Sequence, residues 1–374
     1  MHPDFQHLMH RATQLTQAGD LTAATAAIQA ALRNGLAPAP ARQDDADVID
    51  VEAWEVPDSA GASSAAQHVA DDAAQPAQQP AAAQPAQKPA ATGDTFTAGS
   101  FRNSSGQRAY KLYVPPNPDG TPRPLVVMLH GCTQDADDFA AGTAMNAAAR
   151  EQGFHVLYPV QSRDANPQKC WNWFKHNHQQ QGRGEPSILA GMTREVIAAH
   201  NIDPARVYVA GLSAGGAMAA ILAGAYPELY AAAGVHSGLA AGAATDLPSA
   251  LSAMKGVGRK PAAPAGNGVP VIVFHGDRDA TVNPANADNV IAASVGTNAR
   301  VETVRVAGAG SKRDSTRHLY RDAAGNIVAE RWDVHGAGHA WAGGSDQGSY
   351  TDRTGPDATA EMLRFFFART SRAQ

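Results

Sequence analysis

Short apolar runs that end in glycine or proline recur along the chain from Thr95 onward. Runs of four to eight apolar residues between turn residues are typical of buried strands. Segments with apolar residues at helical spacing lie between them, for example Ile188–His200 and Thr359–Arg369. This alternation predicts an α/β domain over residues 95–374, with a mostly parallel sheet and helices on both faces. The apolar runs are "PLVVMLHG" (Pro124–Gly131), "FHVLYP" (Phe154–Pro159), "RVYVAG" (Arg206–Gly211), "AAAGVHSG" (Ala231–Gly238) and "VPVIVFHG" (Val269–Gly276).

The first part of the chain has a different pattern. Residues 1–35 contain two stretches with apolar residues at helical spacing, separated by the turn "AGD" at Ala18–Asp20, and predict an amphipathic helical hairpin. Residues 36–94 are rich in Ala, Pro, Gln and Asp and have few large apolar side chains. Such a segment cannot offset its ordering entropy by burial, so we expect a disordered linker before the α/β domain.

Composition narrows the classes of function. The net charge of the 374 residues is −5 and no run of Lys or Arg occurs, so we expect no nucleic-acid partner. No stretch approaches ~18 consecutive apolar residues, so we expect no membrane span. The N-terminus lacks a basic start followed by an apolar core, which favours a cytoplasmic protein and leaves other export routes open. The two cysteines, Cys132 and Cys170, are either buried thiols or one disulfide.

One serine stands where an apolar strand meets an alanine-rich helix. Ser213 lies in the sequence Gly211-Leu212-Ser213-Ala214-Gly215, directly after "RVYVAG". Small residues at these positions allow a tight strand-to-helix turn that exposes the serine hydroxyl at the helix N-terminus. The helix dipole favours negative charge at that point. The pattern therefore predicts that Ser213 is a nucleophile.

A serine nucleophile needs a base, and the base needs an acid that orients it. Both partners follow the serine when the order along the chain is Ser, Asp, His. "HGDRDATV" offers Asp277 and Asp279 after a late apolar run, and we favour Asp279. "VHGAGHAW" offers His335 and His339, and we favour His339. A zinc site on the two histidines is disfavoured because the glycines between them oppose the helix that would align them.

The tetrahedral intermediate of acyl transfer needs hydrogen-bond donors for its oxyanion. Backbone N–H groups suit this role because they are fixed in place. We expect one donor from Ala214, next to the nucleophile. The other should come from the turn after "VVMLHG", either from Cys132 or from Thr133.

Together these residues resemble the poly(3-hydroxybutyrate) depolymerase family of esterases, which are α/β-hydrolases related to feruloyl and acetylxylan esterases. The resemblance covers residues 95–369. It implies a catalytic triad of Ser213, Asp279 and His339, with Cys132 at the oxyanion turn and bridged to Cys170. The motifs that carry it are "LHGCTQ" (Leu129–Gln134), "CWNWF" (Cys170–Phe174), "IDPARVYVAGLSAGG" (Ile202–Gly216), "HGDRDATV" (His275–Val282) and "GHAW" (Gly338–Trp341).

The resemblance also implies an ester substrate and no cofactor or metal. A hydroxyalkanoate polyester or its oligomers come first, and the alternatives are feruloyl or acetylxylan-type carbohydrate esters or general short-chain carboxylic esters. A different class is a non-catalytic protein, held on polymer granules through the hairpin of residues 1–35. Three tryptophans either line an apolar acyl cleft or pack in the core: Trp171, Trp173 and Trp341.

Overall fold

A computed structural model of the chain describes residues 93–117, 119–258, 268–295 and 298–371. The hairpin predicted over residues 1–35 lies outside these residues, as does the predicted linker except for residues 93 and 94. The predicted α/β domain lies almost wholly within them.

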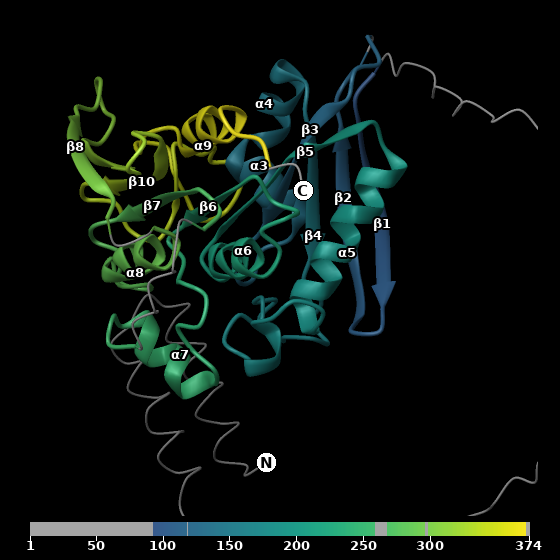
Figure 1. Cartoon of the computed structure of the whole chain (residues 1–374), viewed down its shortest axis with the longest axis horizontal. Coiled ribbons are helices and arrows are strands. Elements are labelled where there is room, and N and C mark those ends of the chain that lie inside the picture. Colours follow the sequence, from purple (N-terminus) through teal and green to yellow (C-terminus); the bar gives the residue numbers. More distant parts are fainter. Residues whose placement is uncertain (1–92, 118, 259–267, 296–297, 372–374) are drawn as a thin grey trace, which may run out of the picture. The chain divides into compact units, whose positions relative to one another are not determined.

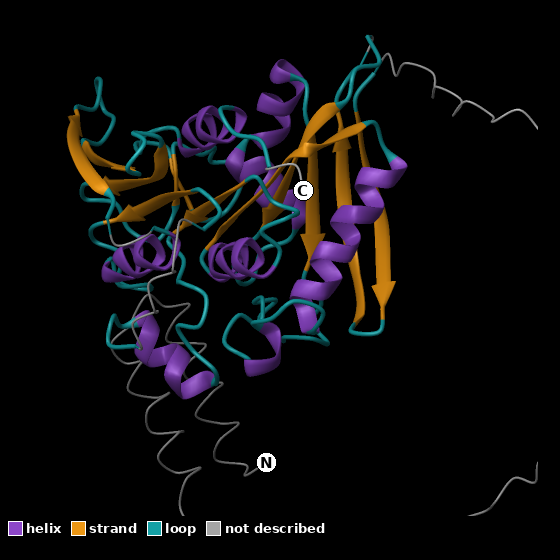
Figure 2. Ribbon diagram, viewed as in Figure 1, coloured by secondary structure: helices purple, strands orange, loops and turns teal. Residues whose placement is uncertain are grey.

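A ten-stranded sheet runs through the described residues (Figures 1 and 2). Its order is β1-β2-β4-β3-β5-β6-β7-β10-β9-β8. The six strands from β4 to β10 in this order are parallel to one another, whereas the pairings of β1 with β2, β2 with β4, β10 with β9 and β9 with β8 are antiparallel. This confirms the predicted, mostly parallel sheet. The strands are β1 (Thr95–Asn103), β2 (Gly106–Val114), β3 (Arg123–Leu129), β4 (His155–Val160), β5 (Ile202–Leu212), β6 (Ala232–His236), β7 (Val271–Gly276), β8 (Arg300–Val306), β9 (Ser315–Arg321) and β10 (Ile327–Val334).

Helices cover both faces of this sheet. One face carries α5 (Gly184–Ala199), α6 (Ala214–Ala225) and α8 (Ala285–Ser294), and the other carries α3 (Ala136–Thr143), α4 (Met145–Gln152) and α9 (Ala358–Phe367), as Figure 1 shows. Three shorter elements and one helix complete the described part: η1 (His176–His178), α7 (Leu247–Met254) and the paired strands β11 (Trp341–Ala342) and β12 (Thr351–Asp352). None of the described helices has the length and apolar character needed to cross a membrane.

The core lies in two layers, one on each side of the sheet. Strand β3 shows how the sequence builds both. Leu125, Val127 and Leu129 are buried in the cluster shared with α5, α6 and α8. Val126 and Met128, which alternate with them, are buried in the cluster shared with α3, α4 and α9. A strand that buries both faces must be apolar throughout, which explains the unbroken run "PLVVML".

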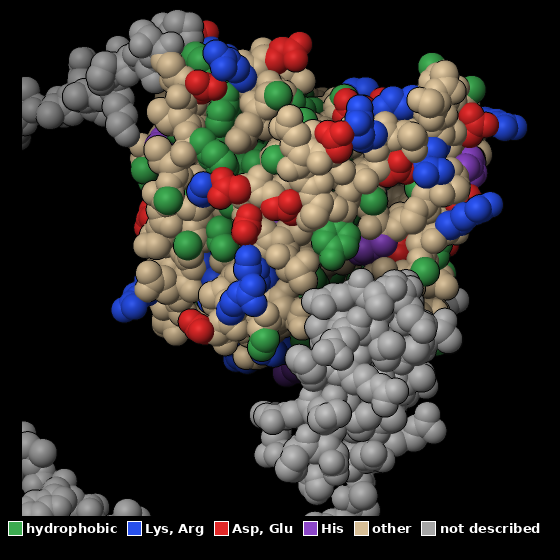
Figure 3. Space-filling model, turned by 180° about the vertical axis from the view of Figure 1, so that it is seen from behind, with side chains coloured by type: hydrophobic (Ala, Val, Ile, Leu, Met, Phe, Trp, Pro, Cys, Tyr) green, Lys and Arg blue, Asp and Glu red, His purple; other side chains and the backbone are tan. Residues whose placement is uncertain are grey.

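Because helices cover both faces, the loops at the carboxyl ends of the parallel strands are where such a sheet presents functional groups. The candidate residues lie in these loops, after β3, β5, β7 and β10. On the face of the molecule drawn in Figure 3, acidic and basic side chains are interspersed.

Candidate active site

Ser213 occupies the turn between β5 and α6, and its backbone is strained. Its φ is 58° and its ψ is −118°, a conformation that residues with a side chain rarely adopt. The Ser213 N–H donates to the carbonyl of His236, at the end of the neighbouring strand β6, over 2.9 Å. The residue is partly exposed, whereas both of its neighbours are buried. The local structure is therefore the sharp turn that the sequence predicts.

The glycines on either side allow the turn to pack against the end of β3. A Cβ atom on Gly215 would lie 2.0 Å from the Leu129 carbonyl oxygen, and one on Gly211 would lie 2.4 Å from the Gly215 carbonyl carbon. Both contacts are with backbone atoms, which cannot move aside at low cost. Glycine is thus required at these two positions by close approach of the backbone.

Asp279 and His339 form a buried pair. The Nδ1 atom of His339 lies 2.7 Å from Oδ2 of Asp279, whose side chain is fully buried, while the His339 side chain is 12% exposed. The other carboxylate oxygen accepts from the N–H groups of Thr281, at 2.9 Å, and Val282, at 2.8 Å. Since an ionised carboxylate only accepts, Nδ1 of His339 carries the donated proton and Nε2 is left to act as a base.

The environment of Asp279 keeps its carboxylate charged. Burial raises its pKa, but hydrogen bonds from His275 and His339, the charge of His339 and the Val282 N–H outweigh burial and hold that pKa well below its usual range. Nε2 of His275 lies 3.3 Å from the carboxylate and 2.8 Å from the Val282 carbonyl. His275 was not predicted from the sequence. Its place at the end of β7, four residues before Asp279, is the signal that points to it.

The two alternatives from the sequence pair with each other instead. Nδ1 of His335 lies 3.1 Å from Oδ2 of Asp277, and both side chains are 43% exposed. Nε2 of His335 lies 2.9 Å from Thr316 Oγ1, so this imidazole already has partners on both sides. Asp279 and His339 therefore form a buried pair and Asp277 and His335 an exposed one, and we keep Asp279 and His339 as the candidate partners of Ser213.

His236 connects the serine turn to the segment that follows His339, and sequence reasoning missed it. Its carbonyl accepts from Ser213, and its ring Nε2 accepts from the N–H of Ala342 over 2.9 Å. Burial, together with the nearby His275 and His339, lowers the pKa of His236 to about 3. The ring is therefore neutral and serves as a hydrogen-bond acceptor inside the core. Its place at the end of a buried strand, in "GVHSG", is the signal available in the sequence.

The turn after β3 lies beside Ser213. A Cβ atom on Gly131 would lie 3.7 Å from the Cβ of Ser213. The N–H of Thr133 donates to the Gln168 carbonyl over 2.7 Å, so it is engaged elsewhere, and Cys132 is the better of the two predicted oxyanion donors. The N–H of Ala214 is the first amide of α6, a position that lacks an acceptor within the helix. These two groups remain our candidates for the oxyanion hole.

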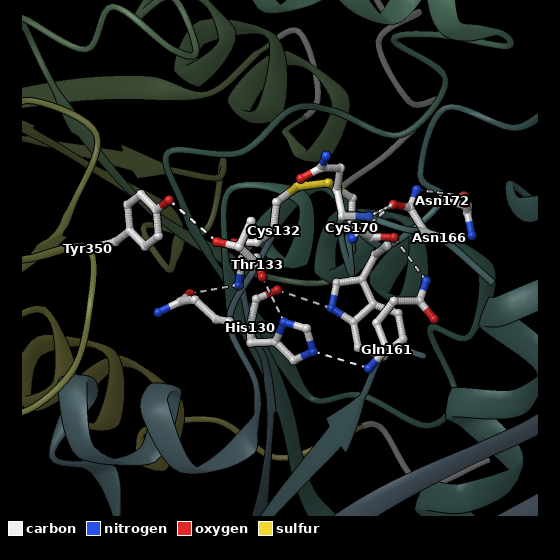
Figure 4. Close-up of a disulfide and its surroundings, with 12 residues drawn as sticks. His130, Cys132, Thr133, Gln161, Asn166, Cys170, Asn172 and Tyr350 are labelled. Atoms are coloured by element: carbon white, nitrogen blue, oxygen red, sulfur yellow. Dashed lines mark hydrogen bonds between the residues drawn. A yellow bond between two sulfur atoms is a disulfide. The ribbon is translucent and has the colours of Figure 1, made fainter. Parts of the chain in front are cut away.

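Cys132 and Cys170 form a disulfide (Figure 4), as the resemblance implies. The bridge joins the turn after β3 to the segment that contains Cys170 and Trp171. The Trp171 indole N–H donates to the His130 carbonyl over 3.1 Å, which adds a second tie between the same two segments. The position of the candidate oxyanion donor therefore depends on a cross-linked pair of loops.

A buried carboxylate is hydrogen-bonded to the cross-linked segment. Glu185, at the start of α5, accepts from the N–H of Asn172 over 2.7 Å and from Nη2 of Arg108 over 3.0 Å. Burial raises the pKa of Glu185, but hydrogen bonds from His178, Gln161 and Asn172 outweigh burial and lower it to about 2. Gln161 in turn donates to the Cys170 carbonyl over 2.9 Å. This network was not predicted from the sequence.

The three tryptophans do not line an exposed surface. Trp171, Trp173 and Trp341 are all buried, with exposed fractions of 0%, 5% and 1%. The indole N–H of Trp341 donates to Thr359 Oγ1 over 3.1 Å, and that of Trp171 is also satisfied within the protein. Their burial favours the packing alternative over an apolar acyl cleft, and the indole N–H groups of Trp171 and Trp341 have partners in the core.

The sheet order, with a strained serine turn at the end of β5, defines an α/β-hydrolase. The family described as Esterase PHB depolymerase matches residues 108–318, which is more than half of the chain. The chain belongs to this family. In the described part of the chain, no group of three or more His, Cys, Asp or Glu side chains is arranged to hold a metal ion.

The chain is similar to three relatives whose names give different substrates. The chain is 34% identical over 236 residues to Poly(3-hydroxyalkanoate) depolymerase C of Paucimonas lemoignei, covering 59% of this chain and 56% of the relative. It is 31% identical over 219 residues to Acetylxylan esterase A of Talaromyces purpureogenus, covering 51% and 55%, and 34% identical over 140 residues to Feruloyl esterase B of Thermothelomyces thermophilus, covering 37% and 47%. The chain thus spans about half the length of these relatives.

A solved structure supports the fold. The acetyl xylan esterase from Aspergillus awamori superposes with a TM-score of 0.53 at 20% identity, covering 65% of this chain and 94% of that one. At this identity the likeness concerns the fold alone.

Proposed function

We propose that the protein is a serine ester hydrolase that acts through an acyl-enzyme. One observation carries this proposal: a serine in a strained turn at the end of β5, accompanied by a buried, ionised Asp279 that orients His339. Family membership supports it, because the three relatives described above are all named as depolymerases or esterases.

The mechanism follows from the roles that each group can play. Oγ of Ser213 attacks the ester carbonyl while Nε2 of His339 takes its proton, and Asp279 stabilises the imidazolium that forms. The N–H groups of Ala214 and Cys132 stabilise the oxyanion. The imidazolium then protonates the leaving alcohol, which leaves an acyl-enzyme. A water molecule, deprotonated by His339, then attacks the acyl carbonyl. The tetrahedral intermediate collapses as the imidazolium returns the proton to Oγ of Ser213, which releases the carboxylic acid and free Ser213.

For the substrate we propose 3-hydroxyalkanoate esters, as polyester or as oligomers. The depolymerase from Paucimonas lemoignei covers more of this chain than the acetylxylan and feruloyl esterases do, which supports this order. A carbohydrate esterase of the acetylxylan or feruloyl type is the second candidate, favoured by the latter two relatives. A general short-chain carboxylesterase would use the same catalytic groups.

A hydrolysis panel tests both the reaction and the substrate. The wild-type protein and Ser213→Ala are compared on p-nitrophenyl acetate, p-nitrophenyl butyrate, a 3-hydroxybutyrate trimer, amorphous poly(3-hydroxybutyrate) and methyl ferulate. We expect release of 3-hydroxybutyrate by the wild-type protein only. Turnover restricted to ferulate or acetate would favour a carbohydrate esterase. No turnover, or full turnover by Ser213→Ala, would contradict the proposed reaction.

For residues 1–35 we propose attachment to polymer granules in the cytoplasm, supported only by their amphipathic pattern. Deletion of residues 1–92 should abolish granule binding while leaving turnover of soluble esters intact. Unchanged granule binding after the deletion would contradict this role.

A further inference from the structure

Several residues around the site have strained backbone. Among the described residues, six non-glycine residues have a positive φ, and one of them, Ala144, joins α3 to α4. Three lie at points already described: Thr133 in the oxyanion turn, Lys169 beside the disulfide, and Ser213 itself. Ser237 follows His236 at the end of β6, and its N–H donates to the Phe274 carbonyl over 2.8 Å. Such conformations persist only where the surrounding structure holds them, and they concentrate at functional sites.

Tyr350 belongs to this set and has no role in the chemistry described so far. Its φ is 53°, and its side chain is 48% exposed, which makes it an exposed large aromatic residue in an unfavourable backbone conformation. A positive φ is unfavourable for a residue with a bulky side chain. Contacts with the rest of the structure must therefore hold the segment that contains Tyr350 in place.

Two sets of hydrogen bonds hold the backbone on either side of Tyr350. Its carbonyl accepts from the N–H of Trp341 over 2.7 Å, two residues after His339, where β11 pairs with β12. The preceding residue, Ser349, donates from its N–H to Oδ1 of Asp138 over 2.8 Å, and its carbonyl accepts from Nε2 of Gln134 over 3.2 Å. The segment is thus tied directly to the loop that carries the candidate base.

The same side chains hold the oxyanion turn. Gln134 accepts from the N–H of Gly131 through Oε1 over 2.9 Å and donates through Nε2 to Asp138 over 2.7 Å. One Gln–Asp pair therefore fixes both the turn beside Ser213 and the backbone that precedes Tyr350.

The side chain of Tyr350 points toward this turn (Figure 4). Its hydroxyl lies 3.4 Å from Oγ1 of Thr133, which in turn donates to the Cys132 carbonyl over 2.6 Å. Since the Thr133 hydroxyl proton is engaged, Tyr350 is the donor in the first contact. The hydroxyl end of the ring thus meets the oxyanion turn, while about half of the side chain stays open to solvent. An aromatic ring held in this way offers an apolar contact surface at little further cost in conformational entropy.

We propose that Tyr350 is a specificity-determining residue whose ring contacts the carbon chain of a bound ester, so that esters larger than acetate are preferred. This proposal rests on the proposed ester hydrolysis and adds to it the residue that selects the acyl chain. It assigns substrate contact to an exposed aromatic side chain, whereas the three tryptophans are buried.

The test is the ratio of kcat/KM for p-nitrophenyl butyrate to that for p-nitrophenyl acetate, since the two esters share a leaving group and differ by two methylenes. In Tyr350→Ala we expect this ratio to fall by about tenfold, the low end of what a methylene in an apolar site is worth. In Tyr350→Phe, which keeps the ring and loses the hydroxyl, we expect the ratio to stay near the wild-type value. Val301→Ala, which shortens another exposed apolar side chain on the distant edge strand β8, is the matched control and should leave the ratio unchanged.

The outcomes distinguish failure of this proposal from failure of the proposed ester hydrolysis on which it rests. If the wild-type protein hydrolyses neither ester, ester hydrolysis itself is contradicted, and the role of Tyr350 with it. If the wild-type protein is active and Tyr350→Ala slows both esters equally, or slows neither, only the role of Tyr350 is overturned.

Because the ring is half exposed, loss of folding in Tyr350→Ala is not expected, and circular dichroism of the variant checks this. If Tyr350→Ala fails to fold, Tyr350→Leu, which keeps an apolar side chain and removes the ring, is measured in the same way and should lower the ratio; an unchanged ratio in that variant would overturn the proposal.

Discussion

At the scale of single residues, the site is a set of polar groups whose partners fix their roles. Asp279 is buried and ionised, His236 is buried and neutral, and His339 is partly exposed. Each state follows from local chemistry: a carboxylate with several donors stays charged, and an imidazole whose burial outweighs the pull of nearby carboxylates stays neutral. The same argument separates the two aspartates that the sequence left as alternatives.

Substitution of each aspartate by asparagine distinguishes them. Asp279→Asn should lower kcat on the order of 10⁴-fold, because an amide no longer holds His339 in the tautomer that leaves Nε2 free as a base. Asp277→Asn is the matched control, since it makes the same change two residues away in an exposed pair, and should change kcat by less than about twofold. Steady-state kinetics on a soluble ester measures both, and a larger loss in Asp277→Asn would reverse the assignment.

At the scale of elements, the strand-to-helix turn depends on how closely α6 approaches β3. Leu129 ends β3, and its carbonyl faces the first turn of α6 where Gly215 lies. The nucleophile is therefore positioned by packing between two elements as well as by the local sequence. Two glycines in the same helix allow this to be tested separately from helix propensity.

Gly215→Ala should sharply reduce activity and destabilise the protein, because the added methyl group would collide with backbone of β3. Overpacking of this kind lowers the free energy of unfolding by about 1–3 kcal/mol, or by more where the backbone must move. Gly224→Ala is the control. Gly224 lies in the same helix and is exposed, and no neighbouring atoms lie within 4 Å of the added Cβ. This substitution should therefore raise the free energy of unfolding by up to about 1 kcal/mol, because alanine favours the helix more than glycine does. Thermal unfolding and kcat of both variants are the measurements. Wild-type activity in Gly215→Ala would show that the close approach is not needed.

At the scale of the whole molecule, local patterns were predictable and long-range contacts were not. The turn at Ser213 could be predicted because a strand, a glycine pattern and a helix are adjacent in the sequence. The choice between Asp277 and Asp279 could only be favoured, since both follow the same strand and the path of the turn decides which side chain is buried. The Ser349–Asp138 contact joins residues 211 positions apart and has no local signature. Burial of the tryptophans likewise depends on what packs around them, which spacing does not reveal.

Whether the disulfide forms depends on the redox conditions of the compartment in which the protein works. Bridges of this kind persist in oxidising compartments, whereas the N-terminal sequence favoured the cytoplasm, so these two expectations point in different directions. A bridge that closes a loop over a sequence separation of 38 residues adds about 3 to 4 kcal/mol to the free energy of unfolding, because it restricts the unfolded chain. The bridge also holds the turn that carries the Cys132 N–H.

We therefore expect dithiothreitol to lower both the melting temperature and kcat of the wild-type protein. Cys170→Ser should match the reduced protein and be insensitive to the reagent, because only the thiol of Cys132 remains. Alkylation of free thiols in intact cells, followed by mass spectrometry, shows which state is present where the protein resides. A bridged pair in cells would place the protein in an oxidising environment and contradict the cytoplasmic expectation. Two free thiols would mean that the oxyanion turn works there without its cross-link, held by hydrogen bonds that include Thr133–Gln168, Trp171–His130 and Gly131–Gln134.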